Sequence, residues 1–174
     1  MRADAVRNRE RIVTSAVRLF TERGPDVQMC EIAEAAGLGV GTLYRHFPDR
    51  QALALDIGVG ALREMTEFAG VAREREDSAW DELLALVRHC ATLPLPLAKS
   101  LSELMPEEAG LADLERSVND LMADLVERAQ KEGAVRADVP PREVVRLLSV
   151  VICRPGARAD DYLTVVMLDG LRAN

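Results

Sequence analysis

The sequence has few aromatic residues, few cysteines and no long apolar run. Aromatic side chains make up 3% of its 174 residues, so a core must be built mainly from Leu, Val, Ala and Met. Cys30, Cys90 and Cys153 form an odd, scattered set, which favours free thiols in a reducing compartment over a disulfide framework. No stretch approaches the roughly 20 apolar residues of a membrane span, and the charged start does not resemble a signal peptide. We therefore expect a cytoplasmic protein that does not bind a membrane.

Patterns that would carry catalysis or bind a metal are also missing from the sequence. Two histidines and three separated cysteines cannot supply a closed zinc site from one chain. His89 and Cys90 are neighbours in sequence, but adjacent helical residues point about 100° apart and cannot face each other as base and nucleophile. We expect no cofactor, no metal and no enzymatic activity.

Apolar residues recur at helical spacing along the chain, and no segment alternates as a strand would. The sequence therefore predicts an all-α fold, and 174 residues suffice for a proper core. We expect a three-helix N-terminal domain over residues 1–49 and a helical C-terminal domain over residues 50–174, with the helix at 50–74 as the connector. Residues 1–6 have no strong pattern and are predicted to form an arm.

The segment from Gln28 to Phe47 predicts two short helices joined by a tight turn. Met29, Ile32 and Ala33 lie on one face of the first helix. Gly37 can adopt the positive φ that ends a helix. In the second helix, Leu43 and Phe47 are four residues apart and are expected to face inward. This is the pattern of a helix-turn-helix, whose second helix enters the major groove of DNA.

The residues left on the outside of the second helix suit DNA. Thr42 is short enough to meet a thymine methyl group or a phosphate, and Arg45 and His46 can donate hydrogen bonds to phosphates or bases. Tyr44 offers a hydroxyl group on a rigid arm. The alternative is an ordinary helical corner with a glycine, which the spacing alone leaves open.

Two stretches of the sequence resemble the DNA-binding domain of TetR-family transcriptional regulators. They are RERIVTSAVRLFTERG (residues 9–24) and IAEAAGLGVGTLYRHFPDRQAL (residues 32–53). The resemblance implies that Thr42, Tyr44 and His46 contact DNA and that Arg50 holds a phosphate. This chain has Gln28 and Gly39 where the family usually has hydroxyl-bearing helix caps, so backbone amides would have to replace a hydroxyl contact there. The predicted DNA-contact residues are Gln28, Gly39, Val40, Gly41, Thr42, Tyr44, Arg45, His46 and Arg50.

The charge is divided unevenly along the chain. The net charge is −7, but residues 1–52 contain eight arginines and seven acidic residues, a local net charge of +1. Non-specific DNA affinity should therefore be modest and depend steeply on salt.

The last two predicted helices are strongly apolar, and the final one is apolar on nearly every side. Such a helix is normally buried, and too little chain remains to cover it, so a second subunit is expected to do so. Burial within one chain is the alternative. The predicted dimer-interface residues are Val144, Leu148, Val151, Ile152, Tyr162, Val165, Val166 and Leu168.

The C-terminal region of the resembled family encloses a small-molecule pocket, and the corresponding region here contains apolar, flexible and polar residues. The alternative is that these residues form a packed core. The predicted pocket residues are Leu84, Val87, Arg88, His89, Leu101, Met105, Leu121, Met122 and Leu125.

These features together predict a homodimeric transcriptional repressor that binds double-stranded DNA at a palindromic operator and is released by a small-molecule effector. One alternative is a small-ligand-binding protein or enzyme on a related helical fold. Another is a regulator that senses redox state through a thiol.

Overall fold

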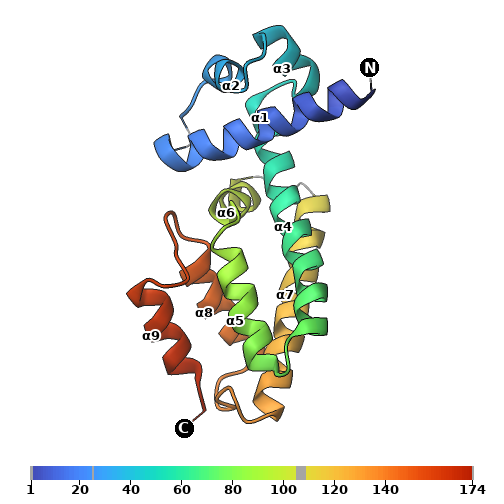
Figure 1. Cartoon of the computed structure of the whole chain (residues 1–174). Helices are drawn as coiled ribbons and strands as arrows, with labels where there is room; N and C mark the ends of the chain where they lie inside the picture. The colour runs from blue at the N-terminus through green and yellow to red at the C-terminus, as the bar shows by residue number, and fades with distance from the viewer. Residues whose placement is uncertain (1, 25, 105–108, 174) are drawn as a thin grey trace. The chain divides into compact units, whose positions relative to one another are not determined.

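The structure, a computed structural model of the chain, describes residues 2–24, 26–104 and 109–173, without the side chains of residues 2, 101–104 and 109. These residues form helices and one isolated bridge between Val135 and Arg172, which confirms the predicted all-α fold. The helices are α1 (Arg2–Arg23), α2 (Met29–Ala35), α3 (Val40–His46), α4 (Arg50–Arg75), α5 (Ala79–Cys90), α6 (Leu95–Leu104), α7 (Ala109–Lys131), α8 (Pro141–Ile152) and α9 (Tyr162–Leu171) (Figure 1).

The chain divides into two compact units, Met1–Ile57 and Gly58–Asn174, and the division falls within α4. The N-terminal unit has a core of aliphatic side chains from α1, α2, α3 and the start of α4. Ile12, Ile32, Leu43 and Leu53 are completely buried there. Each of the four helices thus buries at least one large aliphatic side chain, and the burial of Leu43 determines which side of α3 faces inward.

Residues 2–6 belong to the first turns of α1, so the predicted arm at residues 1–6 is wrong over the part that the structure describes. Asp4 lies in the first turn and accepts a hydrogen bond of 2.7 Å from Arg7, three residues later. An acidic residue near a helix start and a pair at this spacing both favour the helical conformation. A charged segment without an apolar stripe therefore continues the helix that follows it.

In the C-terminal unit, α7 packs against both α5 and α8 (Figure 1). A buried ion pair joins α5 to α7: the Arg128 guanidinium donates to both carboxylate oxygens of Glu82, at 2.9 and 2.8 Å. Glu132 on α7 accepts a hydrogen bond of 2.9 Å from the backbone N–H of Ala79. The start of α5 is therefore held on α7 by both an ion pair and a helix-end contact.

Helix α9 is capped at its start and bonded to another segment of its unit at its end. At its start, the Asp161 carboxylate accepts hydrogen bonds of 2.9 Å from the backbone N–H groups of Thr164 and Arg158. At its end, the backbone N–H of Arg136 donates to Leu171 O at 2.9 Å, and that of Ala173 donates to Ala134 O at 3.1 Å. Within the described residues, no helix is long and apolar enough to cross a bilayer.

Candidate nucleic-acid interface and cavity

Helix α3 is positioned by a buried side and by the turn that precedes it. Leu43 and Phe47 are buried, as predicted from their spacing. Gly37 has φ of 62°, and the N–H of Leu38 returns to Ala33 O at 2.9 Å, which closes the end of α2. The Arg11 guanidinium donates to Gly37 O at 3.3 Å. These contacts hold the turn between α2 and α3 in one conformation.

The opposite side of α3 is open. Val40 is 40% exposed and Tyr44 is 47% exposed, and Arg45 is also exposed. Thr42 and His46 are half-buried. A Cβ atom added to Gly39 or Gly41 would meet no atom within 4 Å, so the backbone at the start of α3 is sterically accessible.

The side chain of Arg45 folds back toward the start of α3. Its Nε donates to Gly41 O at 3.2 Å, and its Nη2 donates to Thr42 Oγ1 at 3.3 Å. The guanidinium and the threonine hydroxyl therefore occupy the same exposed face, one turn apart. Because both bonds are on the surface, where their net free energy is small, another acceptor can replace them at little cost.

We expected the backbone amide that precedes α2 to be available to a phosphate, but it is already hydrogen-bonded within the chain. The Glu31 carboxylate accepts a hydrogen bond of 2.9 Å from the Gln28 N–H and also receives one of 3.0 Å from Arg23. An incoming phosphate would meet this carboxylate. The Gln28 amide is therefore already used within the chain.

Arg50 lies at the first position of α4, half-buried against α1. Its guanidinium carbon is 5.6 Å from the centre of the Phe20 ring. Its Nη2 is buried and has no hydrogen-bond acceptor among the described residues. An unpaired guanidinium nitrogen is costly to bury, so a side-chain movement that brought it to an acceptor would be favourable.

Arg9 contributes to the unit in a way that the sequence does not reveal. Its guanidinium carbon lies 4.8 Å from the centre of the Phe47 ring, and it forms an ion pair with Asp56. The partners are far apart in sequence, so no local spacing signals the contact. Arg9 therefore braces the end of α3 against α4 inside the N-terminal unit.

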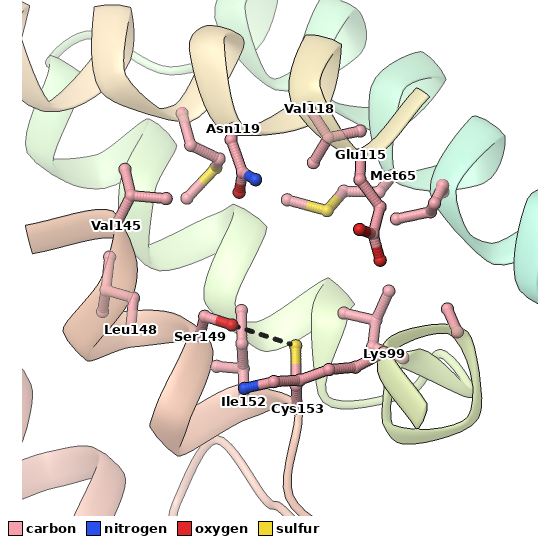
Figure 2. Close-up of a pocket in the computed structure, with 14 residues that line it drawn as sticks. Met65, Lys99, Glu115, Val118, Asn119, Val145, Leu148, Ser149, Ile152 and Cys153 are labelled. Carbon is pink, nitrogen blue, oxygen red and sulfur yellow. Dashed lines mark hydrogen bonds between the residues drawn. The ribbon is translucent and has the colours of Figure 1, made fainter. Parts of the chain in front are cut away.

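The C-terminal unit contains a cavity of about 240 Å³ among α4, α6, α7 and α8. Most of its wall is apolar. Polar groups come from Lys99 on α6, from Glu115 and Asn119 on α7, and from Ser149 on α8, with Cys153 just after α8. In Figure 2, the Glu115 and Asn119 side chains project from α7 into this space. The Ser149 hydroxyl and the Cys153 sulfur are 3.7 Å apart.

The seven predicted pocket residues whose side chains the structure describes do not gather around this cavity. Of these seven, Met122 lines it. Leu84, Val87 and Arg88 instead line a separate recess of about 200 Å³ beside α9. The prediction selected residues from α5 through α7 by type and included none from α4 or α8, because sequence does not determine how each helix is rotated.

The remaining predicted pocket residues have other surroundings. Leu125 is buried in the core, and Leu121 is half-buried. The His89 ring stacks on Phe68 with ring centres 4.0 Å apart, and its Nε2 lies 3.6 Å from a Glu64 carboxylate oxygen. The side chain of Leu101 and the whole of Met105 lie outside the described residues.

The predicted dimer residues fall into two groups. Val144, Leu148, Val151 and Ile152 are buried within the chain, so they form the inner face of α8 and are not available to a partner. The exposed apolar residues of α8 are instead Leu147 and Val150.

On α9, Tyr162, Val165 and Val166 are exposed, as is Leu163, which was not in the predicted set. Leu168 is half-buried. An uncovered apolar surface therefore exists on α8 and α9, and it includes some of the predicted interface residues but not those of the inner face of α8.

The chain matches two family models. Residues 12–57 match the bacterial regulatory proteins of the tetR family, and residues 76–173 match the C-terminal domain of SbtR-like transcriptional regulators. A helix-turn-helix transcriptional regulator of Staphylococcus aureus (strain bovine RF122 / ET3-1) is 50% identical over 54 residues, which are 30% of this chain and 29% of that relative. The match thus spans less than a third of the relative's length.

Solved structures match over nearly the whole chain. The TetR transcription regulatory protein from Mycobacterium vanbaalenii is 30% identical, with 99% of each chain covered and a TM-score of 0.70. AibR, solved in complex with isovaleryl coenzyme A and operator DNA, is 20% identical and has a TM-score of 0.64, with 94% of this chain and 95% of that chain covered. This second likeness concerns the fold alone.

Proposed function

The chain belongs to the TetR family of bacterial transcriptional regulators, and from that premise we propose that it is a homodimeric repressor that releases a palindromic operator when a small molecule occupies its C-terminal unit. Proteins of this family are DNA-binding regulators and not enzymes. Its site of action would be the bacterial cytoplasm, where the DNA is.

One observation carries the proposal for DNA. Helix α3 buries Leu43, and on its opposite side Tyr44 and Arg45 are exposed and Thr42 is partly exposed. A helix held in this way can lie in the major groove with its polar face against the bases and phosphates. Val40, Gly41 and His46 would lie beside these contacts. Arg50, with its unpaired nitrogen, would meet a phosphate.

The exposed apolar surface of α8 and α9 supports the proposal of a homodimer. Tyr162 is 91% exposed and Val166 is 67% exposed, which is costly for residues of this size in water. A two-fold interface places the same surface of each subunit against its copy. The symmetry requires two operator half-sites, separated by about 34–36 Å for one helical turn of DNA.

The cavity among α4, α6, α7 and α8 supports the proposal of an effector. A small molecule can change the affinity for DNA only if it binds one conformation of the protein more tightly than another. Because α4 both lines the cavity and begins in the N-terminal unit, it is the element through which such a preference would act.

The thiol-sensing alternative receives little support from two of the three cysteines. Burial raises the pKa of Cys90 to about 12, and the charge of Cys153 adds to the effect. Burial likewise raises the pKa of Cys153. Both groups are therefore poor thiolates near neutral pH, and thiolates are the reactive form.

The experiment that tests the proposal is selection of bound duplexes from a random DNA library, followed by sequencing. We expect enrichment of one palindrome that binds two protein chains. Enrichment of a single half-site with one bound chain would contradict the dimer, and no enrichment by the folded, ligand-free protein at low salt would contradict specific DNA binding.

A further inference from the structure

The cavity of the C-terminal unit has an apolar wall built from three helices. Leu62 and Met65 come from α4, Val118 and Met122 from α7, and Val145 and Leu148 from α8. All of these side chains except the methionines are branched hydrocarbons, and the methionines can adjust to an irregular surface. Most of a bound molecule would therefore contact only hydrocarbon and thioether groups.

The size of the cavity limits the molecule it can hold. A dry cavity of about 150 Å³ is known to bind benzene. The present cavity of about 240 Å³ would by proportion hold on the order of ten non-hydrogen atoms. A longer molecule would place only part of its length in this volume, because the site is open to solvent on the side of the exposed Asn119.

The two charged side chains of the cavity carry charges of opposite sign. Among the described lining residues, Lys99 supplies one positive charge and Glu115 one negative charge. Lys99 lies on α6 and Glu115 on α7, and Figure 2 shows both beside the same space. Besides burial and the Ser149 hydrogen bond, their charges act on the pKa of Cys153 in opposite directions, Lys99 lowering it and Glu115 raising it. The two charges therefore influence a common region.

Neutral polar groups complete the lining. Asn119 on α7 can both donate and accept hydrogen bonds, and so can the hydroxyl of Ser149 on α8. A carbonyl or hydroxyl group of a ligand can pair with either of them, or with the Lys99 ammonium. A carboxylate at the same place would be attracted by Lys99 but repelled by Glu115, and an amine would meet the reverse, so neither ion gains a net attraction that offsets the hydration it loses.

We propose that this cavity binds an uncharged amphipathic molecule of roughly ten non-hydrogen atoms, with an aliphatic body and one hydroxyl or carbonyl end, and that the Lys99–Glu115 charge pair excludes carboxylic acids and amines of the same size. The inference rests on the proposed function only for its consequence, which is that binding of the molecule releases DNA. The selectivity itself is a property of the cavity and can be measured without DNA.

The first test is calorimetric titration of the full chain at pH 7 with four eight-carbon probes: 1-octanol, 2-octanone, octanoate and octylamine. We expect the alcohol and the ketone to bind about tenfold more tightly, or better, than either ion. Equal or tighter binding of octanoate or octylamine would overturn the proposal, as would failure of all four probes to bind.

Two variants test the charge pair reciprocally. Lys99→Met removes a positive charge from the described lining and keeps the Glu115 carboxylate, so the preference should move about tenfold toward octylamine. Glu115→Gln leaves Lys99, so the preference should move about tenfold toward octanoate. Arg116→Gln is the matched control, because Arg116 is on α7 but is largely exposed and paired with Asp113 outside the cavity.

Preferences that do not move in either cavity variant, or that move equally in the control, would overturn the assignment. Thermal melting establishes that each variant is folded, and Lys99→Gln replaces Lys99→Met if the latter is not. Failure to select an operator while octanol binds selectively would refute the proposed function and leave this inference standing. An operator released by octanoate and not by octanol would do the reverse.

Discussion

The Arg50 guanidinium lies over the Phe20 ring, with 5.6 Å between the guanidinium carbon and the ring centre. The contact links the start of α4 to α1 within the N-terminal unit, and it holds a cation ready beside α3. One nitrogen of this cation has no acceptor among the described residues. Arg50 is thus held in place by an aromatic ring, and a phosphate that reached this nitrogen would supply the acceptor it lacks.

Replacing Arg50 with alanine should weaken binding to every duplex by a similar factor, because a phosphate contact carries no sequence information. The salt dependence of binding should become less steep by about one unit of slope. Titration of specific and random duplexes at several salt concentrations measures both quantities. A loss confined to the selected operator sequence would instead assign Arg50 to a base.

The Glu82–Arg128 ion pair predicts an asymmetric effect on stability. Arg128→Met leaves Glu82 buried without its partner, which should cost up to about 3 kcal/mol of unfolding free energy. We take the low end of the usual range because the Arg128 side chain is 34% exposed. The double variant Glu82→Leu/Arg128→Met should recover most of this loss. Denaturant unfolding measures both, and a double variant less stable than Arg128→Met would contradict the explanation.

Val150 and Val151 are neighbours on α8 with opposite surroundings, being 61% and 1% exposed. Val150→Asp should dissociate the dimer without unfolding the subunit, since it places a charge on the proposed interface. Val151→Ala should preserve the dimer and lower stability by roughly 1–3 kcal/mol through loss of core packing. Sedimentation and thermal melting separate the two effects. A Val150→Asp protein that stays dimeric would move the interface elsewhere.

Asp161 predicts a dependence of stability on acid. Hydrogen bonds from the backbone N–H groups of Thr164 and Arg158 hold the pKa of this carboxyl well below its usual range. Its contribution to stability is therefore present above the ordinary pKa of about 4 and is lost as the pH falls below it. Asp161→Asn should reduce the fall in melting temperature between about pH 5 and pH 3 relative to the wild type. Identical falls would contradict this role.

The orientation of α3 was predictable from sequence because it depends on local spacing. Leu43 and Phe47 are four residues apart, and Gly37 provides the turn, so the buried and exposed faces follow from one helical period. The bend of the chain around Gly37 was equally local. The Arg9–Asp56 and Arg11–Gly37 contacts were not, because they join residues that only the folded unit brings together.

The inner and outer faces of α8 could not be distinguished from sequence. Val144, Leu148 and Val151 form one apolar stripe, while Leu147 and Val150 form a second beside it. Both stripes have helical spacing, and packing against α7 decides which one is buried. The cavity posed the same problem, since its walls depend on the rotation of α4, α6, α7 and α8 about their own axes.

The central claim is that the outward face of α3 binds DNA, and Tyr44 tests it most directly. Tyr44 is 47% exposed, so Tyr44→Ala should change stability by no more than about 0.5 kcal/mol. The decisive measurement is an equilibrium titration of the selected palindrome with the wild type and with Tyr44→Ala. We expect the variant, still folded and dimeric, to bind at least about tenfold more weakly, a loss of roughly 1.4 kcal/mol. Unchanged affinity in a folded dimer would contradict the claim that this face of α3 lies against DNA.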